Sequence, residues 1–379
     1  MAESKAATAK GGLEGVTAAD SSIGKIDGLK GELRYRGYLI TDLAKDSDFV
    51  ETTYLLLYGE LPTKAQHQEL EKKLTAERQV PGQVMDILRQ IAPRMAPMDA
   101  LRTSVSALCL DDVSGHVIDR DANLQRGIRL VARFPTLVAA YDRIRDGKEP
   151  LAPRKDLSHA ANFLYMLTGE VPKDEVARMF DVCLVLHAEH GFNASTFAGR
   201  VTAATLSDVY SAVTSAIGAL KGPLHGGANT AVMNTLLEIG SVEGVEPYLD
   251  NALTHGEKIM GFGHRVYKVV DPRAIILREY SERMADLCGD RRWYEMSAKL
   301  EQLVKSRKGI DMNVDFYSAS TYYYMGIKPD LYTAIFAISR IAGWVAHILE
   351  QYANNRLIRP RSNWVGSGPR DYVGIDKRS

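Results

Sequence analysis

The chain has 379 residues, more than the roughly 100 to 200 typical of one domain, so we expect two domains. Lysine plus arginine equals aspartate plus glutamate at 47 each, so no overall charge favours nucleic acid or a membrane surface. The three cysteines are widely spaced and form no CxxC pair, which predicts reduced thiols and no disulfide framework or structural zinc.

Small residues dominate the first ten positions, which predicts a mobile N-terminal arm. The start of the chain carries no apolar targeting segment. We also expect no apolar run of the roughly 18 to 20 residues that a membrane helix needs. These features favour a soluble, cytoplasmic protein.

Residues 24–38 alternate apolar and polar side chains around glycines, the pattern of a short hairpin. From Phe49 onward apolar residues recur at helical spacing; Gly59 ends the first helix, and Thr63 begins the next with a capping box. Further helices are predicted at 81–92, 97–110, 121–146, 160–167, 173–189, 207–220 and 329–354. The residues of the last helix expected to face the core are Phe336, Ile341, Trp344, Val345 and Ile348. Because strand-like alternation is almost absent after residue 40, the predicted class is all-α.

Glycines and histidines cluster after Gly222 and precede a charged helical stretch at 273–307. We therefore expect a smaller helical domain at 221–326. The large domain comprises 1–220 with the N-terminal arm, and the chain returns to it at 327–379, which ends in a polar tail.

The segment GFGHRVYKVVDPR, residues 261–273, is the densest group of polar chemistry in the chain. Its glycines permit a close backbone approach to a ligand, and His264, Lys268 and Arg273 can bind an anion. This combination suits a small acidic substrate. A solvated basic turn is the structural alternative.

Two histidines, His187 and His190, share the sequence HAEH. At i, i+3 spacing both could lie on one helix face and bind zinc, but neither the HExxH nor the HxxEH pattern is present. We therefore expect no metal. His187 is better explained as a structural histidine, and His190 as the one that faces a ligand.

His225 lies in GPLHGGAN, directly before a predicted helix. Backbone N–H groups and the positive end of the helix dipole disfavour an imidazolium there, so His225 is predicted to be neutral and to donate to a developing oxyanion. A tight turn without chemistry is the alternative. The chain has no GxSxG, GxGxxG or GxxxxGK[ST] motif, which argues against a serine hydrolase and against nucleotide-binding modules.

Asp315 lies among apolar and aromatic neighbours in NVDFYS. Such a carboxylate can accept a proton from a carbon acid, although a helix-capping role explains it equally well. Arg340 lies within an apolar helix and needs a carboxylate partner. Together with Arg273 and with Arg359 in the tail, it could bind a dicarboxylate.

Taken in order, these motifs resemble the citrate synthase family over nearly the whole chain: HAEHGFNAST, GPLHGGAN, GFGHRVYKVVDPR, NVDFYSA, SRIAGW and IRPR. The resemblance implies a mostly helical fold in which a smaller domain closes over the substrates of a larger one. It also implies a homodimer whose active sites each borrow a residue from the partner subunit. Within the family, the chain resembles the short bacterial and archaeal class.

The resemblance assigns roles to individual residues. Asp315 matches the base that takes a proton from acetyl-CoA, His225 the donor to the enolate, and His264 the residue that polarises the oxaloacetate carbonyl. Matches to oxaloacetate ligands are His190, Arg273, Arg340 and, from the other subunit, Arg359. Matches to coenzyme A positions are Lys258, Met260, Gly261, Phe262, Lys268 and, more loosely, Lys308.

The implied reaction is the condensation of acetyl-CoA with oxaloacetate, with coenzyme A as co-substrate and no permanently bound cofactor. The same motifs fit 2-methylcitrate synthase, because one methylene in a pocket changes binding by only about 1 to 3 kcal/mol. A non-catalytic helical assembly protein that kept the fold is a more distant alternative.

Overall fold

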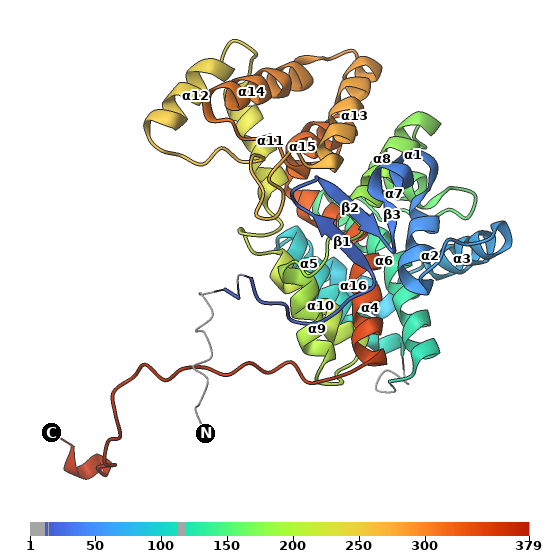
Figure 1. Ribbon diagram of the computed structural model, residues 1–379. Coiled ribbons are helices and arrows are strands. Elements are labelled where there is room, and N and C mark those ends of the chain that lie inside the picture. Colours follow the sequence, from blue (N-terminus) through green and yellow to red (C-terminus); the bar gives the residue numbers. More distant parts are fainter. Residues whose placement is uncertain (1–11, 14, 113–117, 379) are drawn as a thin grey trace.

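The computed structural model describes residues 12–13, 15–112 and 118–378. Its regular structure is helical apart from one small antiparallel sheet near the N-terminus, so the all-α prediction is confirmed. The predicted N-terminal arm falls largely outside the described residues. The described helices form two groups, which Figure 1 shows as a larger body below and a smaller cluster above.

The first group contains the helices before residue 221 and the long helix near the C-terminus. Their bounds are α1 (Ile40–Asp46), α2 (Phe49–Tyr58), α3 (Lys64–Glu77), α4 (Gly82–Ile91), α5 (Pro97–Ala107), α6 (Arg120–Arg145), α7 (His159–Thr168), α8 (Asp174–His187), α9 (Ala194–Ala203), α10 (Val209–Leu220) and α16 (Tyr332–Ala353), with the 3₁₀ turns η1 (Leu108–Asp111) and η2 (Pro329–Leu331).

Local signals set several of these boundaries. Thr63 and Gln66 form the predicted capping box, and Gly59 ends α2 in the left-handed conformation with φ of 95°. The prediction omitted α1 and α9. α9 begins where the Asn193 side chain accepts a hydrogen bond from the Thr196 backbone N–H, a capping signal contained in the sequence FNAST.

The long helix α16 lies at the centre of the first group (Figure 1). The five residues predicted to face the core are all buried: Phe336, Ile341, Trp344, Val345 and Ile348. The expectation of no long apolar run was wrong, because Pro329–Ala353 is long and apolar enough to cross a membrane by length and composition. Within the molecule, however, 94% of its most apolar window is buried, as expected for a core helix.

The predicted hairpin is confirmed as β1 (Gly24–Asp27) and β2 (Glu32–Tyr35), with a short third strand, β3 (Tyr38–Leu39). Ile26 pairs with Leu33, and Gly24 pairs with Tyr35. The hairpin tip contacts the second group, since the Lys268 backbone N–H donates to the Gly28 carbonyl at 2.8 Å. The sheet therefore ties the two groups together.

The second group contains α11 (Ala228–Ile239), α12 (Val245–Thr254), α13 (Pro272–Cys288), α14 (Arg292–Lys308) and α15 (Val314–Tyr324). The charged stretch predicted at 273–307 is two helices, because Gly289 adopts φ of 66° and ends α13. Figure 1 shows this group as a separate cluster joined to the body near α15 and α8.

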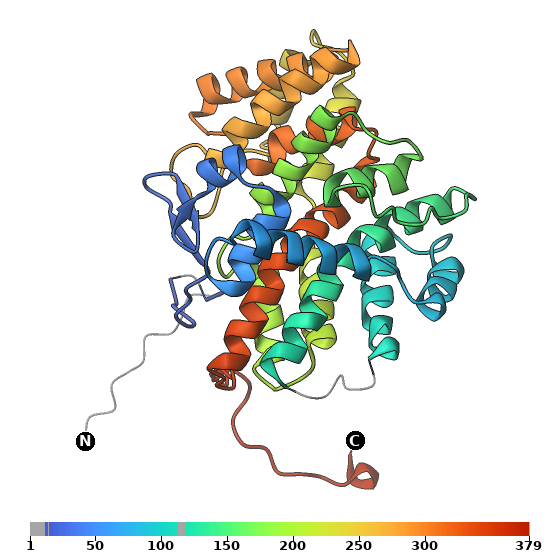
Figure 2. The same ribbon diagram turned by 90° about the vertical axis from the view of Figure 1, so that its right-hand side faces the viewer.

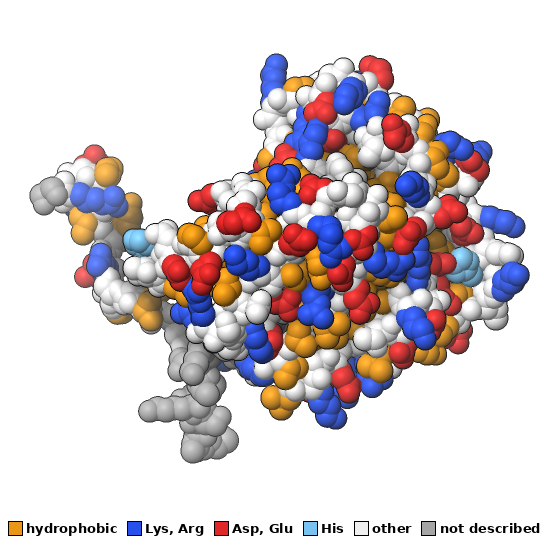
Figure 3. All heavy atoms as spheres, turned by 90° about the horizontal axis from the view of Figure 1, so that it is seen from above, with side chains coloured by type: hydrophobic (Ala, Val, Ile, Leu, Met, Phe, Trp, Pro, Cys, Tyr) orange, Lys and Arg blue, Asp and Glu red, His pale blue; other side chains and the backbone are white. Residues whose placement is uncertain are grey.

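After α16 the chain leaves the body as an extended tail that ends in η3 (Ile375–Lys377) (Figure 2). The tail exposes large apolar side chains: Leu357 is 58% exposed, Trp364 82% and Tyr372 85%. The surface of the body differs from the tail. On the face seen in Figure 3, acidic and basic side chains are interspersed, as the balanced composition implies.

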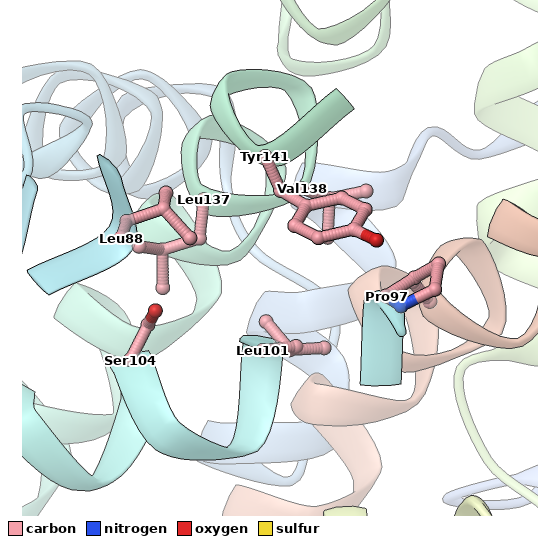
Figure 4. Close-up of a pocket in the computed structure, with 8 residues that line it drawn as sticks. Leu88, Pro97, Leu101, Ser104, Leu137, Val138 and Tyr141 are labelled. Atoms are coloured by element: carbon pink, nitrogen blue, oxygen red, sulfur yellow. The ribbon is translucent and has the colours of Figure 1, made fainter. Parts of the chain in front are cut away.

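A small pocket in the first group illustrates the packing of α4, α5 and α6 (Figure 4). It is lined mainly by apolar side chains: Leu88, Pro97, Leu101, Leu137, Val138 and Ala334, with Ser104 and Tyr141. Tyr141 turns its hydroxyl to the Met95 carbonyl at 2.7 Å. This pocket belongs to the core and contains none of the predicted site residues.

Candidate active site

A short backbone pairing brings the GFGH segment beside the start of α15. Phe262 and Met312 form an antiparallel bridge, and the Asn313 N–H donates to the Gly261 carbonyl at 2.9 Å. Gly261 has φ of 84°, and a Cβ there would lie 2.7 Å from the Phe316 ring. Only glycine fits that position, so the pairing is specified locally.

Asp315 lies in the first turn of α15 and does not cap it. The cap is Asn313, whose side chain accepts from the Asp315 N–H at 3.0 Å, so the alternative reading of Asp315 as a helix cap is wrong. Burial raises the pKa of Asp315 to about 6, against the lowering effect of the Arg273 charge. A carboxylate with such a pKa is a stronger base than an exposed one and is still ionised near neutral pH.

His264 is held in one tautomer by its own loop. Its Nδ1 accepts hydrogen bonds from the backbone N–H groups of Val266 at 3.0 Å and Tyr267 at 3.1 Å. Burial, followed by the Arg273 charge, lowers the pKa of His264 to about 4, so the ring is neutral. Its single proton therefore lies on Nε2, which can donate to a ligand.

His225 is also neutral, but with the opposite tautomer. The Ser195 N–H donates to His225 Nε2 at 3.2 Å, which leaves the ring proton on Nδ1. The Ser195 hydroxyl lies 2.8 Å from the same nitrogen and in turn accepts from Trp344 Nε1 at 3.1 Å. His225 is thus a second fixed donor.

The neutrality predicted for His225 has a cause other than the one expected. The helix α11 is capped by Gly227, two residues after His225, so the ring does not lie in the first turn. Burial lowers the pKa of His225 to about 4, and the Arg340 charge adds to this effect.

Arg273 and His190 are buried in the same cluster as Tyr267 and His264. The Arg273 guanidinium forms a bidentate pair with Asp271, with Nε–Oδ1 at 3.0 Å and Nη2–Oδ2 at 2.7 Å, and both side chains are buried. The His190 ring lies 5.3 Å from the His264 ring, and its Nε2 is 3.3 Å from the Tyr267 hydroxyl. Burial and then the Arg273 charge lower the pKa of His190 well below its usual value.

Arg340 is fully buried on α16. It donates from Nε to the His187 carbonyl at 2.7 Å, and its guanidinium lies 4.6 Å from the centre of the Phe336 ring. The carboxylate partner expected from the sequence does not form an ion pair with it within the described part of the chain. Its charge acts on His190, His225 and Asp315, which places it electrostatically in this site.

The zinc alternative for HAEH has no support. α8 ends at His187, so the two histidines do not share a helix face. His187 is a buried structural residue whose Nδ1 lies 2.8 Å from the Cys183 carbonyl. No group of three potential metal-binding side chains occurs among the described residues.

Other predicted residues lie further from this cluster. Arg359 is exposed in the tail and lines a groove of about 1270 Å³ with residues 16–22 and α9 of the same chain. Lys258 and Lys268 are exposed on the loop that carries Met260 and Phe262, and Lys308 is exposed at the end of α14. Within this single chain, Arg359 is not brought to the histidines.

The sequence interpretation missed several residues that orient the others: Asn193, Ser195, Tyr267, Asp271 and Trp344. Two signals could have identified some of them. Asp271 directly precedes a proline at a helix start, a common capping position, and Ser195 follows the Asn193 cap in FNAST. The contacts of Trp344 and Tyr267 join segments distant in sequence.

The arrangement combines one basic carboxylate with two neutral histidines whose donor atoms are fixed, near two buried arginines. Removing a proton from carbon next to a carbonyl requires a base and a donor to the forming enolate. A second donor can activate an electrophilic carbonyl. The site therefore suits carbon–carbon bond formation between a carbon acid and an anionic carbonyl compound.

Comparisons with known proteins agree with this chemistry. Residues 12–361 match the family described as "Citrate synthase, C-terminal domain". The chain is 50% identical to a citrate synthase of Haloferax volcanii over 97% of this chain and 99% of that protein. It is 51% identical to citrate synthase 2 of Bacillus subtilis, over 98% of this chain and all of that protein.

Solved structures give the same result. A citrate synthase of Thermoplasma acidophilum, in a ternary complex with carboxymethyl coenzyme A and oxaloacetate, matches with a TM-score of 0.90 at 34% identity, over 97% of this chain and 98% of that one. The Thermotoga maritima citrate synthase matches with a TM-score of 0.86 at 40% identity, over 97% and 99% of the two chains. This chain belongs to the citrate synthase family.

Proposed function

We propose that this protein is a citrate synthase, which condenses acetyl-CoA with oxaloacetate and water to citrate and coenzyme A. The observation that carries the proposal is the combination of Asp315, with a pKa raised to about 6, and two neutral histidines, His225 and His264, held in opposite tautomers. Family membership and the ligands of the Thermoplasma acidophilum complex support the choice of substrates.

The proposed first step is enolisation. Asp315 takes a methyl proton from acetyl-CoA while His225 Nδ1–H donates to the thioester oxygen, so that charge on that oxygen is stabilised as it develops. The α-proton of a thioester is only weakly acidic, which is why the base and the donor must act together.

The proposed second step forms the carbon–carbon bond. The enolate carbon attacks the oxaloacetate carbonyl, whose oxygen receives the proton of His264 Nε2 and becomes a hydroxyl. The imidazolate left on His264 regains a proton from the attacking water of the next step. Water then hydrolyses the thioester of citryl-CoA, releasing citrate and coenzyme A. The fixed tautomer of His264 favours donation over proton acceptance at Nε2, in agreement with this role.

The same proposal assigns the binding residues. Oxaloacetate would contact His190, Arg273 and Arg340, together with Arg359 from a partner subunit. Coenzyme A would lie along residues 258–262, with Lys268 and, more loosely, Lys308 near its phosphates. The exposure of Lys268 and Lys308 fits contact with phosphate groups.

We propose that residues 221–326 form the domain that closes over the substrates, moving relative to 1–220 and 327–379. Closure would protect the enolate from water. Within residues 221–326, α15 packs on α11 and α13, and α12 packs on α14, which supports a compact unit that moves as one body. The cytoplasm is the proposed compartment, in agreement with three free cysteines.

A homodimer explains the tail. Its exposed Leu357, Trp364 and Tyr372 need a partner surface, and Arg359 lies among them. A mixed dimer of inactive Arg359→Ala and Asp315→Asn chains should regain activity, because one of its two sites would receive an intact Arg359 and an intact Asp315. A mixture that stays inactive although heterodimers form would disprove that Arg359 acts in the active site of the partner subunit.

The activity itself is tested by free thiol release from acetyl-CoA in the presence of oxaloacetate. We expect release that depends on both substrates. The absence of thiol release by folded protein would refute the proposed function and favour the non-catalytic assembly alternative.

A second candidate is 2-methylcitrate synthase, which would use propionyl-CoA. A relative from Bacillus subtilis named citrate/2-methylcitrate synthase is 43% identical over 94% of this chain and 96% of that protein. Measuring kcat/KM for acetyl-CoA and propionyl-CoA distinguishes the two: the proposal expects a higher value for acetyl-CoA, and the reverse order would favour the alternative.

A further inference from the structure

Glu189 is a fully buried carboxylate beside the site to which the proposed mechanism gives no role. None of its surface is exposed, and it follows His187 and precedes His190 in the HAEH segment. A buried carboxylate costs free energy unless hydrogen bonds and a counter-charge compensate it. The contacts of Glu189 therefore show which hydrogen bonds and which opposite charge stabilise the buried carboxylate.

One oxygen of Glu189 is held by neutral donors. Oε1 accepts from the Gly191 N–H at 2.5 Å and lies 3.0 Å from His347 Nε2. On the other side of the same ring, Arg200 Nη1 lies 3.3 Å from His347 Nδ1. Arginine can only donate and a carboxylate can only accept, so the ring proton lies on Nε2 and points at Glu189. His347 thus orients the carboxylate without cancelling its charge.

The other oxygen, Oε2, is buried without a hydrogen-bond partner and faces α16. A Cβ built on Gly343 would lie 2.7 Å from this atom, so the carboxylate occupies a gap that only glycine leaves open. Arg340, Gly343 and His347 are spaced i, i+3 and i+7 and share one face of α16. Glu189 therefore lies over this face between Arg340 and His347.

Among the residues that the structure describes, no carboxylate forms an ion pair with Arg340. Arg340 donates a hydrogen bond to the His187 carbonyl, and burial lowers its pKa to about 10. Among the charges that oppose this lowering of the Arg340 pKa, that of Glu189 is the largest, ahead of Tyr35 and Asp315. The Glu189 carboxylate and the Arg340 guanidinium thus stabilise each other electrostatically, and Glu189 also acts on Arg36.

We propose that Glu189 is a positioning residue for oxaloacetate binding: seated in the Gly343 gap and oriented by His347, it supplies the buried counter-charge that compensates the Arg340 guanidinium and leaves its terminal nitrogens free for a substrate carboxylate. The inference rests on the proposed function, in which Arg340 binds oxaloacetate. Glu189 itself touches neither substrate.

The test separates binding of the two substrates. Glu189→Gln keeps the shape and an oxygen for the Gly191 N–H, but it removes the charge. We expect KM for oxaloacetate to rise about tenfold, with KM for acetyl-CoA changed less than about twofold. Glu189→Asp keeps the charge on a shorter side chain and should give an intermediate KM for oxaloacetate.

Glu350→Gln is the matched control. Glu350 accepts from Arg200 at 2.8 Å in the same chain of contacts, but it is partly exposed and lies beyond His347 from Arg340. Its substitution should leave KM for oxaloacetate within about twofold of wild type. If the contacts among Glu189, His347, Arg200 and Glu350 were purely structural, Glu189→Gln and Glu350→Gln would change KM for oxaloacetate by similar factors.

Failure of the proposed function and failure of this inference give different results. If the proposed function is wrong, wild-type protein releases no thiol. In active protein, a selective rise of KM for oxaloacetate in Glu189→Gln supports the inference. No rise, or an equal rise for both substrates, overturns it. If the glutamine variant does not fold, the same criterion applies to Glu189→Asp.

Discussion

Arg273 and Arg340 are both buried in one site but are compensated in different ways. Arg273, at the start of α13 in the second group, carries its counter-ion two residues away in the bidentate Asp271. Arg340, within α16 of the first group, donates to a backbone carbonyl and has Glu189 as its main nearby negative charge. One arginine is therefore neutralised locally, and the other depends on the tertiary structure.

The source of each counter-charge decides whether the arginine keeps it when the two groups of helices move relative to each other. The Asp271–Arg273 pair is formed within one element, so it would persist in the proposed closure of the second group. The charge of Arg340 is balanced mainly by Glu189 of the body, with a smaller contribution from Asp315 of the second group. Movement of the second group thus need not separate a buried arginine from its counter-ion, which a closing domain requires.

The largest expected effect concerns Asp315, the carboxylate that is influenced by both arginines. Asp315→Asn removes the proposed base and should lower kcat by about 10² to 10⁴-fold, measured by thiol release. The control is Asp311→Asn on the neighbouring exposed ion pair with Lys305, which should remain active. An Asp315→Asn enzyme within tenfold of wild type would contradict the assignment.

The compensation of Arg273 is tested by Asp271→Asn. Asparagine can still cap α13, but it leaves a buried guanidinium without its counter-ion, so we expect a loss of about 3 to 5 kcal/mol in the free energy of unfolding. Urea denaturation at pH 7 measures it. Asp250→Asn, on an exposed pair with Arg307, should cost less than about 1 kcal/mol. Equal losses would show that Arg273 does not depend on Asp271.

The pH dependence reports the balance of charges on Asp315. Because the base must be ionised and its pKa is raised to about 6, kcat/KM should fall about tenfold per pH unit below that value. The pKa values of His225 and His264, lowered to about 4, keep both rings neutral over this range. A profile that stays flat down to pH 5 would contradict the raised pKa.

The raised pKa of Asp315 also makes the free energy of unfolding depend on pH. The folded pKa of Asp315 exceeds its usual 3.8, so ionisation favours the unfolded chain and stability decreases as pH rises from about 4 to about 6. Asp315→Asn should therefore raise the unfolding temperature at pH 7 and have little effect below pH 4. A lower unfolding temperature of Asp315→Asn at pH 7 would contradict the prediction that ionised Asp315 destabilises the folded protein.

The smallest expected effect concerns the contact between the hairpin and the loop that leads to Arg273. A Cβ on Gly28 would lie 2.2 Å from the Val266 carbonyl oxygen, so Gly28→Ala should weaken the Lys268–Gly28 hydrogen bond. We expect a loss of about 1 to 2 kcal/mol in stability and a few-fold lower kcat/KM. Gly82→Ala, with no neighbour within 4 Å, is the control; equal effects would argue against a specific contact.

Much of the fold was predictable because its signals are local. The Thr63 capping box and the left-handed Gly59 specify where helices start and stop, and the five core residues of α16 follow from helical spacing. The role of α16 as a core helix is not a local signal. α16 was long and apolar enough to pass for a membrane helix, and only its surroundings show that it is a core helix.

The site was predictable in a different sense. The sequence by itself determined which chemical groups are available, and their order along the chain resembles one family closely enough to assign roles to His225, His264 and Asp315. It could also specify pairs within one turn, such as Asp271 with Arg273, since residues so close in sequence are close in any fold.

Only the tertiary structure decided protonation states and partners. The proton positions on His225 and His264 depend on which N–H groups reach their rings, and the pKa of Asp315 depends on burial by helices far apart in sequence. The same holds for Glu189, whose charge matters because Gly343, 154 positions later, leaves room for it. Electrostatic effects depend on distance and on exclusion of water, and neither is fixed until the chain has folded.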